Sequence, residues 1–191
     1  SIGVESTFEN RNEYRDLLIT ANGMEEYIGG VIMFDETLRQ STTSDKKVLF
    51  PDYLIAKGVV PGIKVDKGAK NLAGFSNEKV TEGLDGLRER LGEYYDLGAR
   101  FAKWRAVITI GENIPSVACY QANTHALARY AALCQEAGLV PIVEPEVLMD
   151  GSHAIDKCYE VTEASLKTTF DQLEKQNVSL EGIVLKPNMV I

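Results

Sequence analysis

The stretch LVPIVEPE, residues 139–146, is an apolar run that ends in two glutamates, Glu144 and Glu146, separated by a proline. Three other extended-looking runs close in the same way, on two charged or polar residues two positions apart. They end in Lys64-Val65-Asp66, Lys103-Trp104-Arg105 and Lys186-Pro187-Asn188. Residues i and i+2 of a strand point to the same face, so each run turns its polar pair to one side. Four parallel strands of this kind would gather lysines, an arginine and carboxylates at their carboxyl ends, where α/β proteins place their chemistry.

Apolar residues along the chain alternate between two spacings. Short continuous apolar runs predict buried strands, and helical spacing predicts amphipathic helices. We expect strands at residues 29–34, 59–66, 101–110, 140–143 and 182–190, and helices at 10–20, 50–57, 81–97, 116–137 and 152–176. A glycine-containing loop is expected at 68–77. This alternation indicates βαβ units, and therefore right-handed crossovers and a parallel sheet.

Two architectures fit this alternation: an open doubly wound sheet and part of a (β/α)8 barrel. Helices cover both faces of an open doubly wound sheet, so both faces should be apolar. In a barrel only the outer face must be apolar, and the interior can turn polar toward the catalytic end. The polar pairs therefore favour an α/β fold of the (β/α)8 TIM-barrel type. The 191 residues suffice for one domain with a substantial core, so we expect a single domain over 1–191.

Composition excludes several classes of protein. The net charge of −8 argues against non-specific binding of nucleic acid, and no apolar run approaches the length of a membrane span. Cys119, Cys134 and Cys158 form neither a disulfide framework nor a zinc motif, so we expect buried, reduced thiols in a cytosolic protein. His125 and His153 are too scattered for a metal site. No glycine-rich turn matches a nucleotide-binding motif, so neither a metal nor a cofactor is expected.

The polar pairs suggest amine catalysis. A free lysine, with a pKa of ~10.4, is almost wholly protonated at neutral pH, but burial and nearby cations lower the pKa. Lys186 ends the apolar strand GIVL, and Lys103 and Arg105 on the same face would favour its neutral amine, which can form a Schiff base with a ketone. Glu144 could supply acid/base proton transfer, and Lys64, Lys103 and Arg105 could cradle a phosphate. The alternative interpretation is a set of structural ion pairs, but four strands sharing one pattern favour a site.

Six motifs of the chain resemble class I fructose-bisphosphate aldolase. They are GIKVDKG (62–68), EGLDGL (82–87), FAKWR (101–105), LARYA (127–131), VPIVEPE (140–146) and LKPNMV (185–190). The resemblance runs over essentially the whole chain. It implies a (β/α)8 barrel and reversible cleavage of fructose 1,6-bisphosphate to dihydroxyacetone phosphate and glyceraldehyde 3-phosphate. It also implies catalysis without a metal and a homotetramer in the cytoplasm, with a plastid location left open.

The resemblance assigns roles to the polar pairs. Lys186 matches the lysine that forms the Schiff base with dihydroxyacetone phosphate, and Glu144 matches the acid/base glutamate. The residues expected to be catalytic are Lys186, Glu144, Lys103 and Glu146. The residues expected to bind the substrate or its phosphates are Lys64, Arg105, Asp66 and Asn188.

The resemblance also implies parts that residues 1–191 do not contain. The family's first barrel strand carries an aspartate that helps catalysis and would precede Ser1. Strands after Ile191 would carry the serine, the glycine-rich backbone and the arginine that hold the ketose phosphate. We therefore expect this segment to hold strands two to six of eight and to be nearly inactive by itself.

Two other interpretations stay open from the sequence. One is another Schiff-base barrel, such as a transaldolase or a smaller aldolase, which a panel of substrates would distinguish. The other is an interaction or scaffold protein that uses no active site, for which the intact mass is the first measurement.

Overall fold

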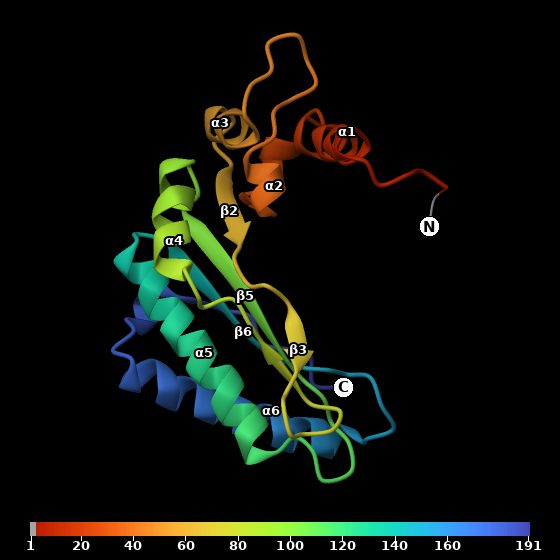
Figure 1. Cartoon of the computed structure of the whole chain (residues 1–191), viewed down its shortest axis with the longest axis vertical. Coiled ribbons are helices and arrows are strands. Elements are labelled where there is room, and N and C mark those ends of the chain that lie inside the picture. The colour runs from red at the N-terminus through yellow and green to blue at the C-terminus, as the bar shows by residue number, and fades with distance from the viewer. Residues whose placement is uncertain (1–2) are drawn as a thin grey trace.

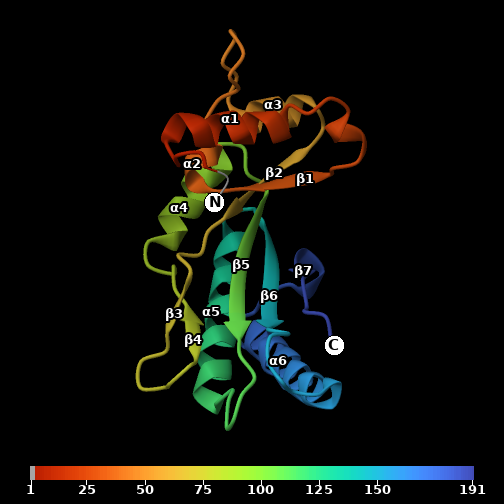
Figure 2. The same ribbon diagram turned by 90° about the vertical axis from the view of Figure 1, so that its right-hand side faces the viewer.

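The computed structural model describes residues 3–191 and is built around a parallel five-stranded sheet (Figures 1 and 2). The strand order is β1-β2-β5-β6-β7, and every neighbouring pair is parallel. The strands are β1 (Gly30–Met33), β2 (Val60–Lys64), β5 (Phe101–Ile108), β6 (Val140–Val147) and β7 (Val184–Leu185). All five predicted strands are therefore present, in the predicted parallel arrangement.

Helices cover one face of this sheet. The helices are α1 (Phe8–Ile19), α2 (Asp35–Leu38), α3 (Phe50–Ala56), α4 (Leu87–Asp96), α5 (Val117–Glu136) and α6 (Ile155–Lys175), with 3-10 turns η1 (Met24–Glu26) and η2 (Leu180–Gly182). Helices α4, α5 and α6 lie on the same side of β5 and β6 (Figure 1). Strands β1 and β2 are strongly turned relative to β5 and β6, so the sheet is curved (Figure 2). A curved parallel sheet with helices outside is part of a (β/α)8 barrel, which confirms that prediction over the doubly wound sheet.

Local sequence explains where the predicted helices begin and end. The Ser116 hydroxyl accepts a hydrogen bond from the Cys119 backbone N–H at 3.1 Å and caps the start of α5. Gly138, with φ of +76°, follows its end, where the predicted helix 116–137 also stops. Thr7 caps α1 in the same way by accepting from the Asn10 N–H at 3.1 Å.

Three predicted elements are wrong in their bounds. The predicted strand 140–143 extends as β6 to Val147. The predicted helix 81–97 is only α4, because Gly83 and Gly86 have φ of +134° and +62°, outside the helical region. The residues before them form a hairpin of β3 (Ala69–Asn71) and β4 (Lys79–Thr81), which includes part of the predicted loop. The predicted strand 182–190 is reduced to the two residues of β7, since η2 occupies its start.

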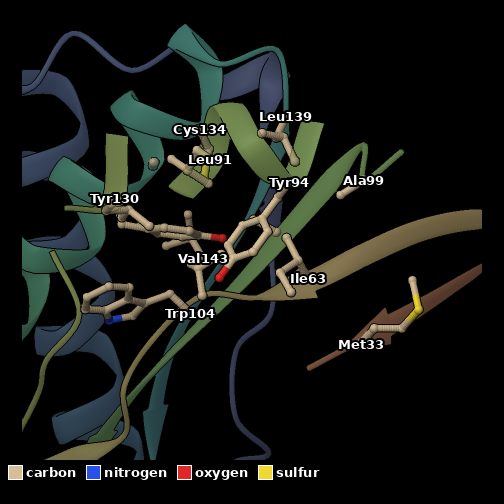
Figure 3. Packing of buried hydrophobic residues seen from close by; sticks show 14 of the residues in the cluster. Met33, Ile63, Leu91, Tyr94, Ala99, Trp104, Tyr130, Cys134, Leu139 and Val143 are labelled. Carbon is tan, nitrogen blue, oxygen red and sulfur yellow. The ribbon is translucent and has the colours of Figure 1, made fainter. Parts of the chain in front are cut away.

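The main core lies between the sheet and its helices (Figure 3). Trp104 of β5 is fully buried and stacks on Tyr130 of α5, with ring centroids 5.5 Å apart. Trp104 therefore packs beneath the helices. The three cysteines are buried in α5 and α6, as predicted. Among the described residues, no helix has the length and apolar character needed to cross a membrane.

Candidate active site

Successive side chains of β5 point alternately to the helix-covered core and to the opposite face of the sheet, where the candidate site lies. Ala102, Trp104 and Ala106 are buried toward the helices. Lys103 and Arg105 alternate with them and therefore lie on the concave face, which the helices leave uncovered. The predicted sidedness of the FAKWR segment is confirmed.

Phe101 forms the floor of this concave face next to β2. A Cβ atom on Gly62 would lie 2.3 Å from the ring of Phe101, so the ring has room only because residue 62 is glycine. In the strand register, Gly62 is opposite Phe101 and Lys64 is opposite Lys103. Lys64 and Lys103 are thus neighbours on adjacent strands, two residues further along each strand than Gly62 and Phe101.

Glu144 lies at the centre of the site. Its side chain is 2% exposed, and its Oε1 accepts a hydrogen bond of 2.5 Å from Nζ of Lys186. Nζ of Lys103 lies 2.8 Å from Oε2 of the same carboxylate, as an ion pair without the alignment of a hydrogen bond. A buried carboxylate therefore contacts two amines from the strands on either side of β6, as the sequence pattern predicts.

Two further ion pairs flank this centre. Arg105 donates through Nε to a carboxylate oxygen of Glu146, and this hydrogen bond raises the pKa of Arg105. Nζ of Lys64 donates to Oδ1 of Asp66 at 2.5 Å, and Oδ2 of Asp66 lies 3.5 Å from the backbone N of Arg105. The structure thus brings the polar pairs of β2, β5 and β6 together in one site. The expectation that each pair closes its strand is wrong for β5 and β6, because these strands continue to Ile108 and Val147 and carry their pairs within them.

The side chains of Asp66 and Asn188 form hydrogen bonds with other groups of the protein. The side chain of Asp66 is 2% exposed, and its Oδ1 also accepts a hydrogen bond of 2.9 Å from the Gly68 N–H. Oδ1 of Asn188 accepts from the Val147 N–H at 3.3 Å, and its Nδ2 donates to Oγ1 of Thr162 at 3.0 Å. Asn188 thereby ties the segment after β7 to the end of β6 and to α6.

The chain is similar over its whole length to proteins of one known family. The family model described as fructose-bisphosphate aldolase class-I matches residues 1–191. The chain belongs to the class I fructose-bisphosphate aldolase family. It is 64% identical over its whole length to a probable class 1 fructose-bisphosphate aldolase of Xanthomonas axonopodis pv. citri. It is 55% identical to the cytosolic fructose-bisphosphate aldolase 4 of Arabidopsis thaliana.

A solved aldolase structure carries the same fold. The chain aligns with the fructose-bisphosphate aldolase of Plasmodium falciparum, crystallised with TRAP and a small-molecule inhibitor, with a TM-score of 0.94 and 48% identity. The alignment covers 99% of this chain and 55% of that one. The chain likewise spans 57% of the Xanthomonas relative and 48% of the Arabidopsis relative, about half the length of each.

Sequence reasoning missed two polar residues that contact the strand ends of this aldolase-family site. The Thr81 hydroxyl donates to the backbone carbonyl of Arg105 at 2.7 Å, and the Arg90 guanidinium donates to the carbonyl of Val65 at 3.0 Å. Both residues lie in the segment that the sequence predicts as one long helix, so no spacing signal marked them. Within residues 3–191, no group of three or more His, Cys, Asp or Glu side chains is arranged to hold a metal ion.

Proposed function

We propose that the intact protein is a class I fructose-bisphosphate aldolase that works through a Schiff base on Lys186. The single observation that carries this proposal is the shared carboxylate: Glu144 contacts the amines of both Lys186 and Lys103. The reaction needs a nucleophilic amine next to a group that can accept and return protons. The family match gives the substrate class, fructose 1,6-bisphosphate and its triose phosphates.

The chemistry follows from this pairing. The nitrogen of Lys186 adds to the ketone carbon C2 of the substrate, the new hydroxyl group takes up a proton and leaves as water, and an iminium ion remains. The C3–C4 bond then breaks, its electron pair moves toward the iminium nitrogen to give an enamine, and the C4 hydroxyl loses its proton to become the aldehyde. Protonation of the enamine at C3 and hydrolysis of the imine release dihydroxyacetone phosphate and return the amine.

We assign the proton transfers of this cycle to Glu144, with Lys103 and Glu146 as the other catalytic residues. Glu144 is within hydrogen-bond distance of the Lys186 amine, which satisfies the geometric requirement for a general base. The side chain of Lys186 is 54% exposed within the described residues, so a ketone has access to it.

The cationic side of the site suits a phosphate. Lys64 and Lys103 are in register on adjacent strands, and Arg105 is 42% exposed beside them. We propose that Lys64 and Arg105 bind substrate phosphate, since guanidinium and ammonium groups form charge-assisted hydrogen bonds with phosphate oxygens. Asp66 and Asn188 then support this cradle through the contacts they make with the strand ends.

We further propose that the intact enzyme is a metal-independent homotetramer that acts in the cytoplasm. The named relatives include a cytosolic aldolase of Arabidopsis and a chloroplastic one of Chlamydomonas reinhardtii, so both compartments are used in the family. Light scattering of the intact protein after gel filtration tests the tetramer. A mass of one or two chains would contradict it.

The proposal is tested by cleavage of fructose 1,6-bisphosphate by the intact protein, with and without a chelator. We expect cleavage that the chelator leaves unchanged and that Lys186→Met abolishes. Lys167→Met is the matched control, because Lys167 is 73% exposed on α6 and pairs only with Glu163 among the described residues. Full activity of Lys186→Met, or loss of activity on chelation, would contradict a Schiff-base aldolase.

A further inference from the structure

Arg90 of α4 connects the helix layer with the carboxyl end of β2, outside the set of residues assigned to the reaction. Resting on the proposed function, we propose that Arg90 is a positioning residue for substrate phosphate. Its guanidinium fixes the backbone between Lys64 and Asp66, and thereby holds the Lys64 amine where the phosphate binds.

Arg90 donates hydrogen bonds to two backbone carbonyls and also interacts with the side chain of Tyr94. Nη1 donates to the carbonyl of Val65 at 3.0 Å, and Nη2 donates to the carbonyl of Gly83 at 2.6 Å. The N–H of Val65 donates to the carbonyl of Lys103 at 3.1 Å. Both backbone groups of Val65 are therefore engaged, one by Arg90 and one by the strand that carries Lys103. Val65 itself is buried, so its carbonyl needs such a partner.

The second carbonyl that Arg90 holds belongs to a segment packed closely against β2. A Cβ atom on Gly83 would lie 2.9 Å from the backbone N of Lys67 and 3.1 Å from Cα of Asp66. The N–H of Lys67 also donates to the Glu82 carbonyl at 2.8 Å. Arg90 thus links two segments that are in van der Waals contact. This link fixes the path of the backbone directly after β2.

This link bears on the site because Lys64 and Asp66 flank Val65. The two side chains form the 2.5 Å ion pair, and Asp66 also approaches the backbone N of Arg105 at 3.5 Å. Lys64, Asp66 and Arg90 also line one side of a cavity of about 460 Å³ whose other side is formed by residues of α2 and α4, among them Asp35 and Glu93. A rotation of the Val65 peptide would move the Lys64 amine relative to both Asp66 and Lys103.

Arginine suits this position better than lysine. Its planar fork can donate to two carbonyls at once, whereas an ammonium is a compact point charge on a different stem. We therefore expect Arg90→Lys to be intermediate between the wild type and Arg90→Met. Arg88→Met is the matched control, since Arg88 lies on the same helix but is 60% exposed and pairs with Glu136 at the surface.

The first test measures kcat and KM for fructose 1,6-bisphosphate cleavage by the intact protein. Lys64 is proposed to bind phosphate in the ground state and in the transition state alike, so its displacement raises KM more than it lowers kcat. We expect KM of Arg90→Met to rise about tenfold, which corresponds to 1.4 kcal/mol, with kcat within about threefold of wild type. Arg88→Met should stay within about twofold in both constants. Unchanged KM in Arg90→Met would overturn the proposal.

A double-mutant cycle separates positioning from general damage to the fold. In the Lys64→Met background there is no amine to misplace, so adding Arg90→Met should change kcat/KM by less than about twofold. A full tenfold effect in that background would overturn the positioning role.

A crystal structure of Arg90→Met completes the test without using activity. We expect the contact between Lys64 Nζ and Asp66 Oδ1 to be broken, and an unchanged contact would refute the inference. If the wild type does not cleave the bisphosphate, the proposed function fails, and this structure alone decides the role of Arg90.

Discussion

Glu144→Gln removes the negative charge that the two amines of the site share. Glutamine keeps the shape of the side chain, so the change isolates charge and proton transfer from packing. Lys103 and Lys186 would then have lost the carboxylate that lies 2.8 and 2.5 Å from them. We expect both the activity and the stability of the protein to fall.

The burial of each partner sets the size of the effect on stability. Hydrogen bonds to charged groups contribute roughly 1.5–3 kcal/mol each. Lys186 donates the hydrogen bond, but its side chain is 54% exposed, so water replaces much of that value. The side chain of Lys103 is 18% exposed and loses an ion-pair partner at a place that water reaches poorly. We therefore expect the free energy of unfolding to fall by about 2 kcal/mol. Loss of a general acid/base should lower kcat by about 10²–10⁴-fold.

Denaturant unfolding and steady-state cleavage of fructose 1,6-bisphosphate by the intact protein measure the two effects. Glu163→Gln is the matched control, since Glu163 makes an exposed i,i+4 ion pair with Lys167 on α6. It should change stability by less than about 0.5 kcal/mol and leave kcat unchanged. A Glu144→Gln enzyme with kcat within threefold of wild type would refute the assignment of proton transfer to Glu144.

Three other predictions test the fold and the extent of the site. Two arginines of α1 hydrogen-bond Glu36 and lower its pKa from 4.5 to about 2, so its stabilising contribution is present above pH 4.5 and is lost as the pH falls toward 2. Glu36→Gln should therefore lower the free energy of unfolding at pH 7 and have a shrinking effect in denaturant titrations at lower pH; an effect that grows on acidification would contradict this sign. Gly62→Ala should destabilise the protein by about 1–3 kcal/mol, because the new methyl group overlaps the Phe101 ring. Gly92→Ala should raise stability by up to about 1 kcal/mol, because a Cβ at this position of α4 meets nothing within 4 Å. Equal effects of the two substitutions in thermal melts would contradict close packing of Phe101 against Gly62. A polypeptide of residues 1–191 alone should show almost no cleavage of the bisphosphate. Activity close to that of an intact aldolase would show that the phosphate-binding residues expected on other strands are not needed.

Most of the fold could be predicted because its signals are local. The period-two pattern of FAKWR placed Trp104 under the helices and its charged neighbours on the other face, and both are observed. The caps at Ser116 and Gly138 bounded α5 correctly. In these places backbone preference and burial favour the same conformation, so a single stretch of sequence is enough to predict the structure it forms.

The errors arise where longer-range contacts decide. Lys79–Thr81 forms a strand by pairing with β3, and Asn123 of α5 holds it in place by accepting from the Thr81 N–H at 3.2 Å and donating to the Lys79 carbonyl at 2.8 Å. No local pattern reveals a partner on another helix. Leu17 has the spacing of a packed helical face, yet it is 68% exposed within the described residues. Periodicity predicts which residues share a face but not what covers that face.

The site could be predicted as a cluster but not in its details. The polar pairs of β2, β5 and β6 indicated which side chains lie together, because strand alternation and a parallel sheet are enough for that. The prediction for the fourth pair holds only for Lys186, since Asn188 contacts Thr162 of α6 in the helix layer. The pairing of Lys186 and Lys103 on one carboxylate depends on strand order, which the sequence implied only through the βαβ rule. The contacts of Arg90 depend on the exact path of the backbone and left no signal in the sequence.

The most direct test of the central claim is chemical trapping on the intact protein. Dihydroxyacetone phosphate and borohydride are added together, the protein is digested, and the modified peptide is located by mass spectrometry. We predict one stable secondary amine, on Lys186, that does not form when the ketone or the borohydride is omitted. An adduct on another lysine, or no adduct in an enzyme that still cleaves fructose 1,6-bisphosphate, would contradict the account.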